Sequence, residues 1–596
     1  MKQKLIAINK QKIKQTTVYI LLVLMHLLLS SLKFPIHAQI ISQISQNTTP
    51  TPDQIRETEI KPPDFNNREP LPETPLPPLE ELLPSPETIP QTPQPSLGDI
   101  PGKITVNRFE VIGSTVFSQA EFTEKLQNLI NKPISFGELL QAREIINQLY
   151  IQRGYITSGA FIPPQELKDG IVKIQVVEGQ IAEINISGLQ RLKPSYIRSR
   201  LELATKQPLD QNRLIQALQM LQIDPLIANL SAELAAGSRP GVNILEVQVK
   251  EADAFSGQIS IDNQRSPSVG TVRRQLEINH HNLLGYGDRF RVGYVNTDGS
   301  NSLDNLSYTF PINAKNGTLG FNYSQTKTNI IEEPFNVLDI QSASRNYQIT
   351  YRQPLHQTPT QEFIIGVIGS RQESETSLLD DPFPLSVGAN DQGEVRISAL
   401  RFFQEYTKRD TKQVFAMRSQ FNLGINAFNA TNNATEPDGQ FISWRGQTQY
   451  LRLLTPDLTL LLRSDIQISD RPLLALEQFS AGGQQSVRGY RQDSLLADNG
   501  LFASAEIRTP ILKVPQWQTK LELSPFFDIG TVWNDSSSDI KIDQQTLSSL
   551  GLGLSLSVAQ NFNARFDWGI PLVKVDKTGN SLQENGLYFS IEYRPF

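Results

Sequence analysis

The residues after about position 253 alternate between apolar and polar in short runs. In one run the apolar positions are Leu458, Leu460, Leu462, Ile466 and Ile468, and the positions between them carry Thr459, Arg463, Asp465 and Gln467. In a second run the apolar positions are Ala503, Ala505, Ile507 and Ile511, and the polar ones are Ser504, Glu506 and Arg508. A period of two residues is typical of a β-strand with one apolar and one polar face.

This alternation predicts a transmembrane antiparallel β-barrel over residues 253–596, with the apolar face toward lipid and the polar face toward water. At about 20 residues for each strand and its turn, the segment accommodates about 16 strands, and bacterial barrels have an even number. A soluble β-sandwich with its charged face outward is the alternative. The fold class expected for the whole chain is therefore mainly β.

The segment before the barrel has a different pattern, in which amphipathic helices lie between strand-like runs. Ser118-Gln-Ala-Glu121 and Ser135-Phe-Gly-Glu138 match the capping box, in which the serine and the glutamate bind each other's backbone N–H groups. Asp210 is the expected N-cap of a later helix. Residues 101–179 and 180–252 each give the order β-α-α-β-β, so we expect two small α+β domains.

Two further segments precede residue 101. Residues 1–38 begin with a lysine-rich stretch, followed from Val18 to Leu32 by an apolar core that is short for a membrane span. This predicts a secretory signal peptide cleaved after Ala38, and an anchor that stays attached is the alternative. Residues 39–100 carry proline every few positions among Gln, Thr and Glu, which predicts a disordered linker.

The composition excludes several classes of protein. No long apolar run follows the predicted signal peptide, and the mean hydropathy is −0.30, which excludes a helical membrane protein. The chain has no cysteine, so its stability does not depend on disulfides. Its formal charge is −6, and removal of residues 1–38 takes away six lysines and no acidic residue, leaving −12. An acidic chain of this kind is not expected to bind nucleic acid.

The sequence offers little that could carry catalysis. The nucleotide-binding pattern Gly-x-x-x-x-Gly-Lys-Ser/Thr is absent. His280 and His281 are neighbours on a predicted strand and therefore point to opposite faces, so they cannot ligate one metal ion together. Of the other three histidines, His26 and His37 lie in the predicted signal peptide. We expect no catalytic residues, no metal site and no cofactor.

A turn-like segment, Ser486-Val487-Arg488-Gly489-Tyr490, lies in a long gap between two strand-like runs. Downstream, the segment from Pro525 to Gly530 has the pattern of a strand. Its alternation puts Asp528 on the face opposite the apolar residues Leu521, Leu523, Phe527, Ile529 and Trp533. On the inner wall of a barrel, Arg488 and Asp528 could form a forked, charge-assisted pair. An ordinary surface loop is the alternative.

This loop, together with a strand of the form Phe-x-Asp-x-Gly, resembles the outer-membrane barrel superfamily that inserts or exports proteins. The resemblance implies that the loop folds into the lumen with Arg488 at its tip, that Gly489 allows a tight backbone and that Tyr490 packs on the wall. The residues that carry it are Val487, Arg488, Gly489, Tyr490, Phe526, Asp528 and Gly530.

The first α+β domain narrows the resemblance. Its segments 150–158, 161–170 and 176–179 are similar to the haemolysin secretion/activation family, the outer-membrane transporters of two-partner secretion. In that family the small domains are periplasmic polypeptide-transport-associated (POTRA) domains. The matching residues are Arg153, Gly154, Tyr155, Pro163, Gln165, Gly170, Glu178 and Gly179.

The resemblance implies an outer-membrane pore whose POTRA domains lie in the periplasm. Those domains would recognise an unfolded exoprotein, a haemagglutinin- or haemolysin-like β-helical client, by strand addition, and the barrel would export it. Outer-membrane lipid would surround the barrel, and the barrel-assembly machinery would act during its biogenesis. Two alternatives are a membrane-protein insertase of the same superfamily and, less favoured, a passive solute porin.

Overall fold

The computed structural model describes residues 103–535, 542, 545–576 and 579–595. The predicted signal peptide (1–38), the predicted linker (39–100) and Phe596 lie outside the described residues. No helix in the described part of the chain is both long enough and apolar enough to cross a membrane.

The first α+β unit is built on two helices that begin at the predicted capping boxes. In each, the N-cap serine, Ser118 or Ser135, accepts from the N–H of the glutamate three residues later, and that glutamate accepts from the N-cap N–H. A short strand before the second helix was not predicted. The elements are β1 (Ile104–Val106), β2 (Arg108–Ile112), α4 (Gln119–Leu126), β3 (Lys132–Ile134), α5 (Phe136–Gln152), β4 (Gly159–Phe161) and β5 (Ile171–Val177).

The strands of this unit form two small sheets around one core. β2 and β5 are parallel, β4 pairs with the other side of β5, and β1 pairs with β3. α5 contributes Leu139, Ala142 and Ile146 to the core, at the spacing of one helix face. β2 and β4 are therefore the two edges of the three-stranded sheet.

The second α+β unit repeats this arrangement. Its elements are β6 (Gln180–Ser187), α6 (Pro194–Glu202), α7 (Gln211–Gln222), β7 (Ile227–Ala236) and β8 (Val242–Glu251). The sheet order is β6-β8-β7, with β6 parallel to β8. The carboxylate of Asp210 caps α7 by accepting from the N–H groups of Asn212 and Arg213. Leu214, Leu218 and Leu221 of α7 are buried in the core.

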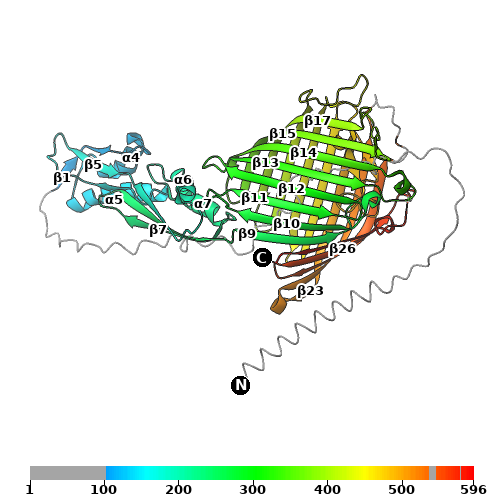
Figure 1. The fold of residues 1–596 in the computed structure, drawn as a ribbon. Helices are drawn as coiled ribbons and strands as arrows, with labels where there is room; N and C mark the ends of the chain where they lie inside the picture. The colour runs from blue at the N-terminus through cyan, green and yellow to red at the C-terminus, as the bar shows by residue number, and fades with distance from the viewer. Residues whose placement is uncertain (1–102, 536–541, 543–544, 577–578, 596) are drawn as a thin grey trace. The chain divides into compact units, whose positions relative to one another are not determined.

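Sixteen long strands among the described residues close into one antiparallel barrel (Figure 1). They are β9 (Phe255–Asp262), β10 (Arg273–His281), β11 (Arg289–Asn296), β12 (Ser300–Pro311), β13 (Thr318–Asn329), β14 (Gln341–Gln357), β15 (Gln361–Leu378), β17 (Glu394–Arg409), β18 (Gln413–Gly424), β19 (Ile442–Thr455), β20 (Leu458–Ser469), β23 (Asn499–Val514), β24 (Thr519–Trp533), β25 (Thr546–Val558), β26 (Phe562–Pro571) and β27 (Leu587–Tyr593). β27 closes the barrel against β9 through a short ladder that joins Ser590–Tyr593 to Asp262–Ile259.

The predicted alternation holds along the strands. On β24 Phe527 and Ile529 are each 39% exposed on the outer face, whereas Asp528 between them is fully buried on the inner face. Most strands are joined by short turns at the barrel end where β9 begins and by longer loops at the other end, which we call the long-loop end. The barrel thus presents an apolar wall outward and a polar wall to its lumen.

Candidate functional site

Residues 470–498, which connect β20 to β23, fold into the barrel and are called the lumen loop here. Within the loop, β21 (Phe479–Ala481) pairs with β22 (Leu495–Ala497), so the loop returns on itself. Its apolar side chains Phe479, Val487 and Tyr490 are buried in a cluster with Phe502 and Val532 of the barrel wall. Apolar burial on both sides therefore attaches the loop to the inner faces of β23 and β24.

Arg488 at the tip of this loop lies against Asp528 of β24. Its Nε donates to Asp528 Oδ2 at 2.7 Å and its Nη2 donates to Oδ1 at 2.9 Å. The backbone N–H of Arg488 also donates to Oδ2, at 3.2 Å. The two side chains are 2% and 0% exposed. The contact is the forked pair that the sequence suggested, and it is enclosed rather than screened by bulk water.

Two further carboxylates complete the surroundings of the guanidinium. Arg488 Nη1 is 2.8 Å from an oxygen of Glu506 on β23 and 3.4 Å from one of Asp567 on β26. Arg565 bridges these same two carboxylates, at 3.0 Å and 2.7 Å. Arg508 binds Glu506 at 2.7 Å. Three arginines thus bind three carboxylates, and these ion pairs compensate in part for the removal of the groups from water.

Apolar contacts fix the orientation of Arg488. The centre of its guanidinium lies 3.3 Å from the centre of the Phe526 ring, a cation–π contact in an enclosed site. Val487 is fully buried, and a Cβ added at Gly530 would come within 2.7 Å of its side chain. Phe526 and Gly530 of the Phe-x-Asp-x-Gly strand therefore provide a surface on which the loop tip fits.

Gly489 and Tyr490 hold the backbone next to Arg488. Gly489 has φ of +99°, and a Cβ there would meet backbone atoms of Gly569 at 3.1 Å, so only glycine fits this close approach without strain. Its N–H donates to the hydroxyl of Tyr588 at 2.9 Å. The Tyr490 hydroxyl lies 2.7 Å from the carbonyl of Ser548 on β25. The loop tip is thus bound to the wall on both sides of the arginine.

A second ion pair holds the first part of the loop to another part of the barrel wall. Arg401 of β17 binds Glu477 of the loop through two contacts of 2.6 Å and 2.9 Å. Both side chains are less than one-tenth exposed. The lumen loop is therefore attached to β17 as well as to β23, β24 and β26.

The residues of the first α+β unit that match the family pattern form a second group, centred on Glu178. Its buried carboxylate accepts from the N–H of Thr115 at 2.7 Å, from the Thr115 hydroxyl at 2.5 Å and from the Tyr150 hydroxyl at 3.0 Å. Burial is the largest cause that raises the pKa of Tyr150, and the Glu178 carboxylate raises it further. Glu178 therefore joins the end of β5 to α5 and to the loop before α4.

The other residues that match the family pattern also hold the backbone through hydrogen bonds. The Gln165 side-chain amide accepts from the Lys173 N–H and donates to the Lys173 carbonyl, both at 2.7 Å, as the backbone of a neighbouring strand would. Pro163 lies two residues earlier in the chain. The carbonyl of Gly170 accepts from the N–H of Asn107 at 2.8 Å. Gly154 and Gly179 have carbonyls that accept from Gln211 and Leu209 of the second unit.

Arg153 and Tyr155 surround the aromatic core of the same unit. The Arg153 guanidinium binds Glu121 at 2.9 Å and lies 4.4 Å from the centre of the Phe117 ring. The Tyr155 ring packs on Tyr150, with 6.0 Å between their centres. The geometry gives these motif residues packing and bonding roles within the unit.

Three functional contacts of the lumen site were missed from the sequence: Glu506, Asp567 and Tyr588. Each occupies an inward position between outward apolar residues, as Asp567 does between Phe566 and Trp568. Alternation placed Glu506 on the water-facing side of its strand and could have placed Asp567 and Tyr588 there too. It could not show that three strands bring their polar groups to one arginine, because strand register and barrel closure decide that.

No group of three or more His, Cys, Asp or Glu side chains in the described ranges is arranged to hold a metal ion. His280 lies 2.5 Å from Arg191, and His281 lies 3.4 Å from the Ser256 hydroxyl. Their separate partners agree with the opposite faces predicted for neighbours on a strand.

Two family models match the chain. The model described as haemolysin secretion/activation protein ShlB/FhaC/HecB matches residues 241–556, and the model of the ShlB-type POTRA domain matches residues 104–179. The first covers more than half of the chain, including most of the barrel and the lumen loop. The second covers the first α+β unit.

Individual relatives are distant but span most of the chain. The outer membrane transporter CdiB of Escherichia coli is 24% identical over 513 residues, which are 83% of each protein. The heme/hemopexin transporter protein HuxB of Haemophilus influenzae strain 86-028NP is 23% identical over 470 residues, 76% of this chain and 80% of that one. The solved structure of CdiB from Escherichia coli matches with a TM-score of 0.64 at 21% identity, over 84% of this chain and 92% of that one.

Proposed function

The chain belongs to the haemolysin secretion/activation family, and from this premise we propose how it exports its client. It is an outer-membrane transporter of two-partner secretion, and the α+β units that precede β9 are on the periplasmic side. The long-loop end of the barrel then faces the outside of the cell. Outer-membrane lipid contacts the apolar outer wall, and the barrel-assembly machinery inserts the protein.

The observation that carries the proposal is the enclosed ion network at Arg488. A loop bound inside the lumen by one arginine to three carboxylates occupies part of the pore that an exported chain must cross. Removing one partner of such a buried pair costs about 3–5 kcal/mol, enough to fix the loop firmly at rest. We assign to Arg488, Gly489, Tyr490 and Asp528 the role of positioning this loop for transport.

The α+β units supply the recognition step. In the first unit β4 is a short edge strand, and Phe161 on it is 46% exposed. An extended client segment can add to such an edge through main-chain hydrogen bonds, which give affinity with little dependence on side chains. The client is a secreted exoprotein, and we propose one of the haemagglutinin- or haemolysin-like β-helical class, whose folding outside the cell would favour transport in one direction.

The proposal is tested by expressing the chain together with a candidate exoprotein in cells that lack both. Export predicts that the exoprotein reaches the medium only when the transporter is present. The insertase alternative predicts instead that other membrane proteins assemble more efficiently, and the porin alternative predicts faster uptake of small solutes without export. A medium free of exoprotein, with the transporter folded in the membrane, would contradict the proposal for that client.

A further inference from the structure

Arg491, three residues after Arg488, makes a separate contact at the long-loop end of the barrel. Its Nη1 and Nη2 bind the two carboxylate oxygens of Glu332 at 2.7 Å and 2.6 Å. Nη1 also lies 3.8 Å from a carboxylate oxygen of Glu584. The three side chains are between 4% and 11% exposed. Two carboxylates on different loops, Glu584 buried and Glu332 slightly exposed, therefore share one arginine of the lumen loop.

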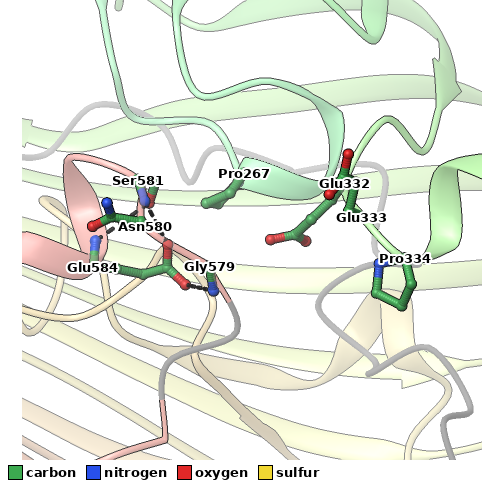
Figure 2. A pocket seen from close by; sticks show the side chains of 8 residues that line it. All are labelled: Pro267, Glu332, Glu333, Pro334, Gly579, Asn580, Ser581 and Glu584. Atoms are coloured by element: carbon green, nitrogen blue, oxygen red, sulfur yellow. Dashed lines mark hydrogen bonds between the residues drawn. The ribbon is translucent and has the colours of Figure 1, made fainter. Parts of the chain in front are cut away.

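The two carboxylates belong to distant parts of the barrel. Glu332 lies in the loop 330–340 between β13 and β14, and Glu584 lies in the loop 572–586 between β26 and β27. Four strands, β9 to β12, separate β27 from β13 around the barrel. Figure 2 shows Glu332 and Glu584 on opposite sides of a pocket that Pro267 of the loop 263–272 also lines. The contact therefore crosses part of the mouth of the pore rather than joining neighbouring strands.

Glu584 is held in position for this contact. Its carboxylate accepts from the N–H groups of Gly579 at 2.7 Å and Ser581 at 2.8 Å, as the dashed lines in Figure 2 indicate. Burial opposes its charged form, but the Ser581 and Gly579 hydrogen bonds and Arg491 together keep the pKa of the Glu584 carboxyl below its ordinary value. The site thus holds a carboxylate at neutral pH.

The residues next to Arg491 and Glu584 add further hydrogen bonds between the loops. The Gln492 N–H donates to the Gln583 side-chain carbonyl at 2.9 Å, and the Gln583 amide donates to the carbonyl of Arg265 at 2.8 Å. Gln583 is fully buried. One short segment of the lumen loop is consequently tied to three other loops, two of them through Arg491.

We propose that Arg491 is a second positioning residue, which holds the outer mouth of the pore closed by tying the lumen loop to Glu332 and Glu584. The inference rests on the proposed export function, in which the exported chain leaves by this mouth. Arg488 binds the wall deeper in the lumen through other carboxylates, so the two contacts can be broken separately. Loss of Arg491 leaves Glu332 and Glu584 without their shared cation, and their like charges then favour an open mouth.

The first test measures the ion conductance of the full-length protein in planar lipid bilayers, which requires no client. For Arg491→Ala we expect the open fraction to rise between about 5-fold and 150-fold, the usual range for coupled sites. Arg471→Ala is the matched control, because Arg471 is in the same loop but its contacts with Glu436 and Asp470 are 3.4 Å long and more than a third exposed. Equal conductance of both variants and the parent protein would overturn the proposal.

A second test uses the absence of native cysteine. Cysteines replace Glu332 and Arg491, and a short bismaleimide joins them, since the long side chains hold the two backbones too far apart for a disulfide. We expect the uncrosslinked double variant to export its client and the crosslinked one to retain it. Full export after complete crosslinking would contradict the proposal for Arg491. Failure of export before crosslinking, with the raised conductance expected on loss of Arg491, would instead count against the proposed function.

Discussion

The two sides of the barrel lumen are built from different chemistry. β23, β24 and β26 present charged residues that bind the lumen loop, whereas β13, β14 and β15 present three successive rows of uncharged residues. These rows are Asn322, Gln348 and Ser370; Ser324, Asn346 and Gln372; and Thr326, Ser344 and Ser374. We call this second region the hydroxyl–amide wall.

The two regions also differ in how far their polar groups are satisfied. Arg488 and its three carboxylates are paired with one another, although the neighbouring Ser549 hydroxyl and Arg463 Nε have no hydrogen-bond partner within the described part of the chain. On the hydroxyl–amide wall, both polar atoms of the Gln372 amide and the Ser344 hydroxyl have none. Each side chain is only 2% exposed. Charged groups thus fix the lumen loop at β23, β24 and β26 and, through Arg401, at β17, whereas the three rows of the hydroxyl–amide wall offer it no charged partner. Ser370 of this wall contacts Arg401 at 3.3 Å.

The largest effect on the stability of the barrel is expected from a substitution at Asp528. Replacement by Asn keeps the shape but removes the charge that pairs with Arg488, and we expect a loss of about 3 kcal/mol in the free energy of unfolding of the barrel. Urea titration in lipid vesicles measures it. The control is Glu375→Gln, because the Arg345–Glu375 pair is also short, at 2.7 Å, but 39% and 49% exposed, so about 0–1 kcal/mol is expected. Equal losses would show that enclosure does not distinguish the sites.

A smaller loss in the free energy of unfolding is expected from a change in the backbone at Gly489, next to Arg488. Gly489→Ala imposes a left-handed φ on a residue with a Cβ and crowds Gly569, which costs about 1–3 kcal/mol. The same titration applies. Gly369→Ala on β15 is the matched change, since the nearest atom to its added Cβ is 4.0 Å away. If the two substitutions had the same effect, the tight fit of the loop tip would not contribute to its attachment.

The smallest change in the free energy of unfolding is expected from a substitution in the hydroxyl–amide wall. Gln372→Leu removes an amide that has no partner, so the unfolding free energy should change by less than about 1 kcal/mol or increase. Gln372→Glu would place an unpaired charge there and should destabilise the barrel. A large loss for the leucine variant would mean that the amide is bonded in the folded protein, and the contrast between the two walls would then be smaller than described.

Much of the fold could be predicted because its signals are local. The serine–glutamate spacing at Ser118 and Ser135 predicted both helix starts, and the alternation on β24 placed Asp528 on the inner face. Family resemblance, rather than spacing, suggested that the lumen loop lies inside the barrel. The alternation could not have shown this, since a surface loop has the same sequence character.

The rest of the site depends on contacts between distant segments. Glu506, Asp567 and Glu332 meet arginines that are between 18 and 159 residues away in the chain. Which acidic residue meets which arginine is set by strand register and by the path of the loops, neither of which a local pattern contains. β3 was missed for a related reason, because its three residues include Pro133 and form a strand only by pairing with β1.

The central claim is that the enclosed arginine at the loop tip is needed for transport and not only for stability. The most direct measurement is export of the exoprotein by the Arg488→Ala variant, compared with the parent at equal amounts of folded barrel in the outer membrane. The account predicts that the client accumulates in the periplasm while the barrel is assembled normally. Undiminished export by a correctly assembled Arg488→Ala barrel would contradict it.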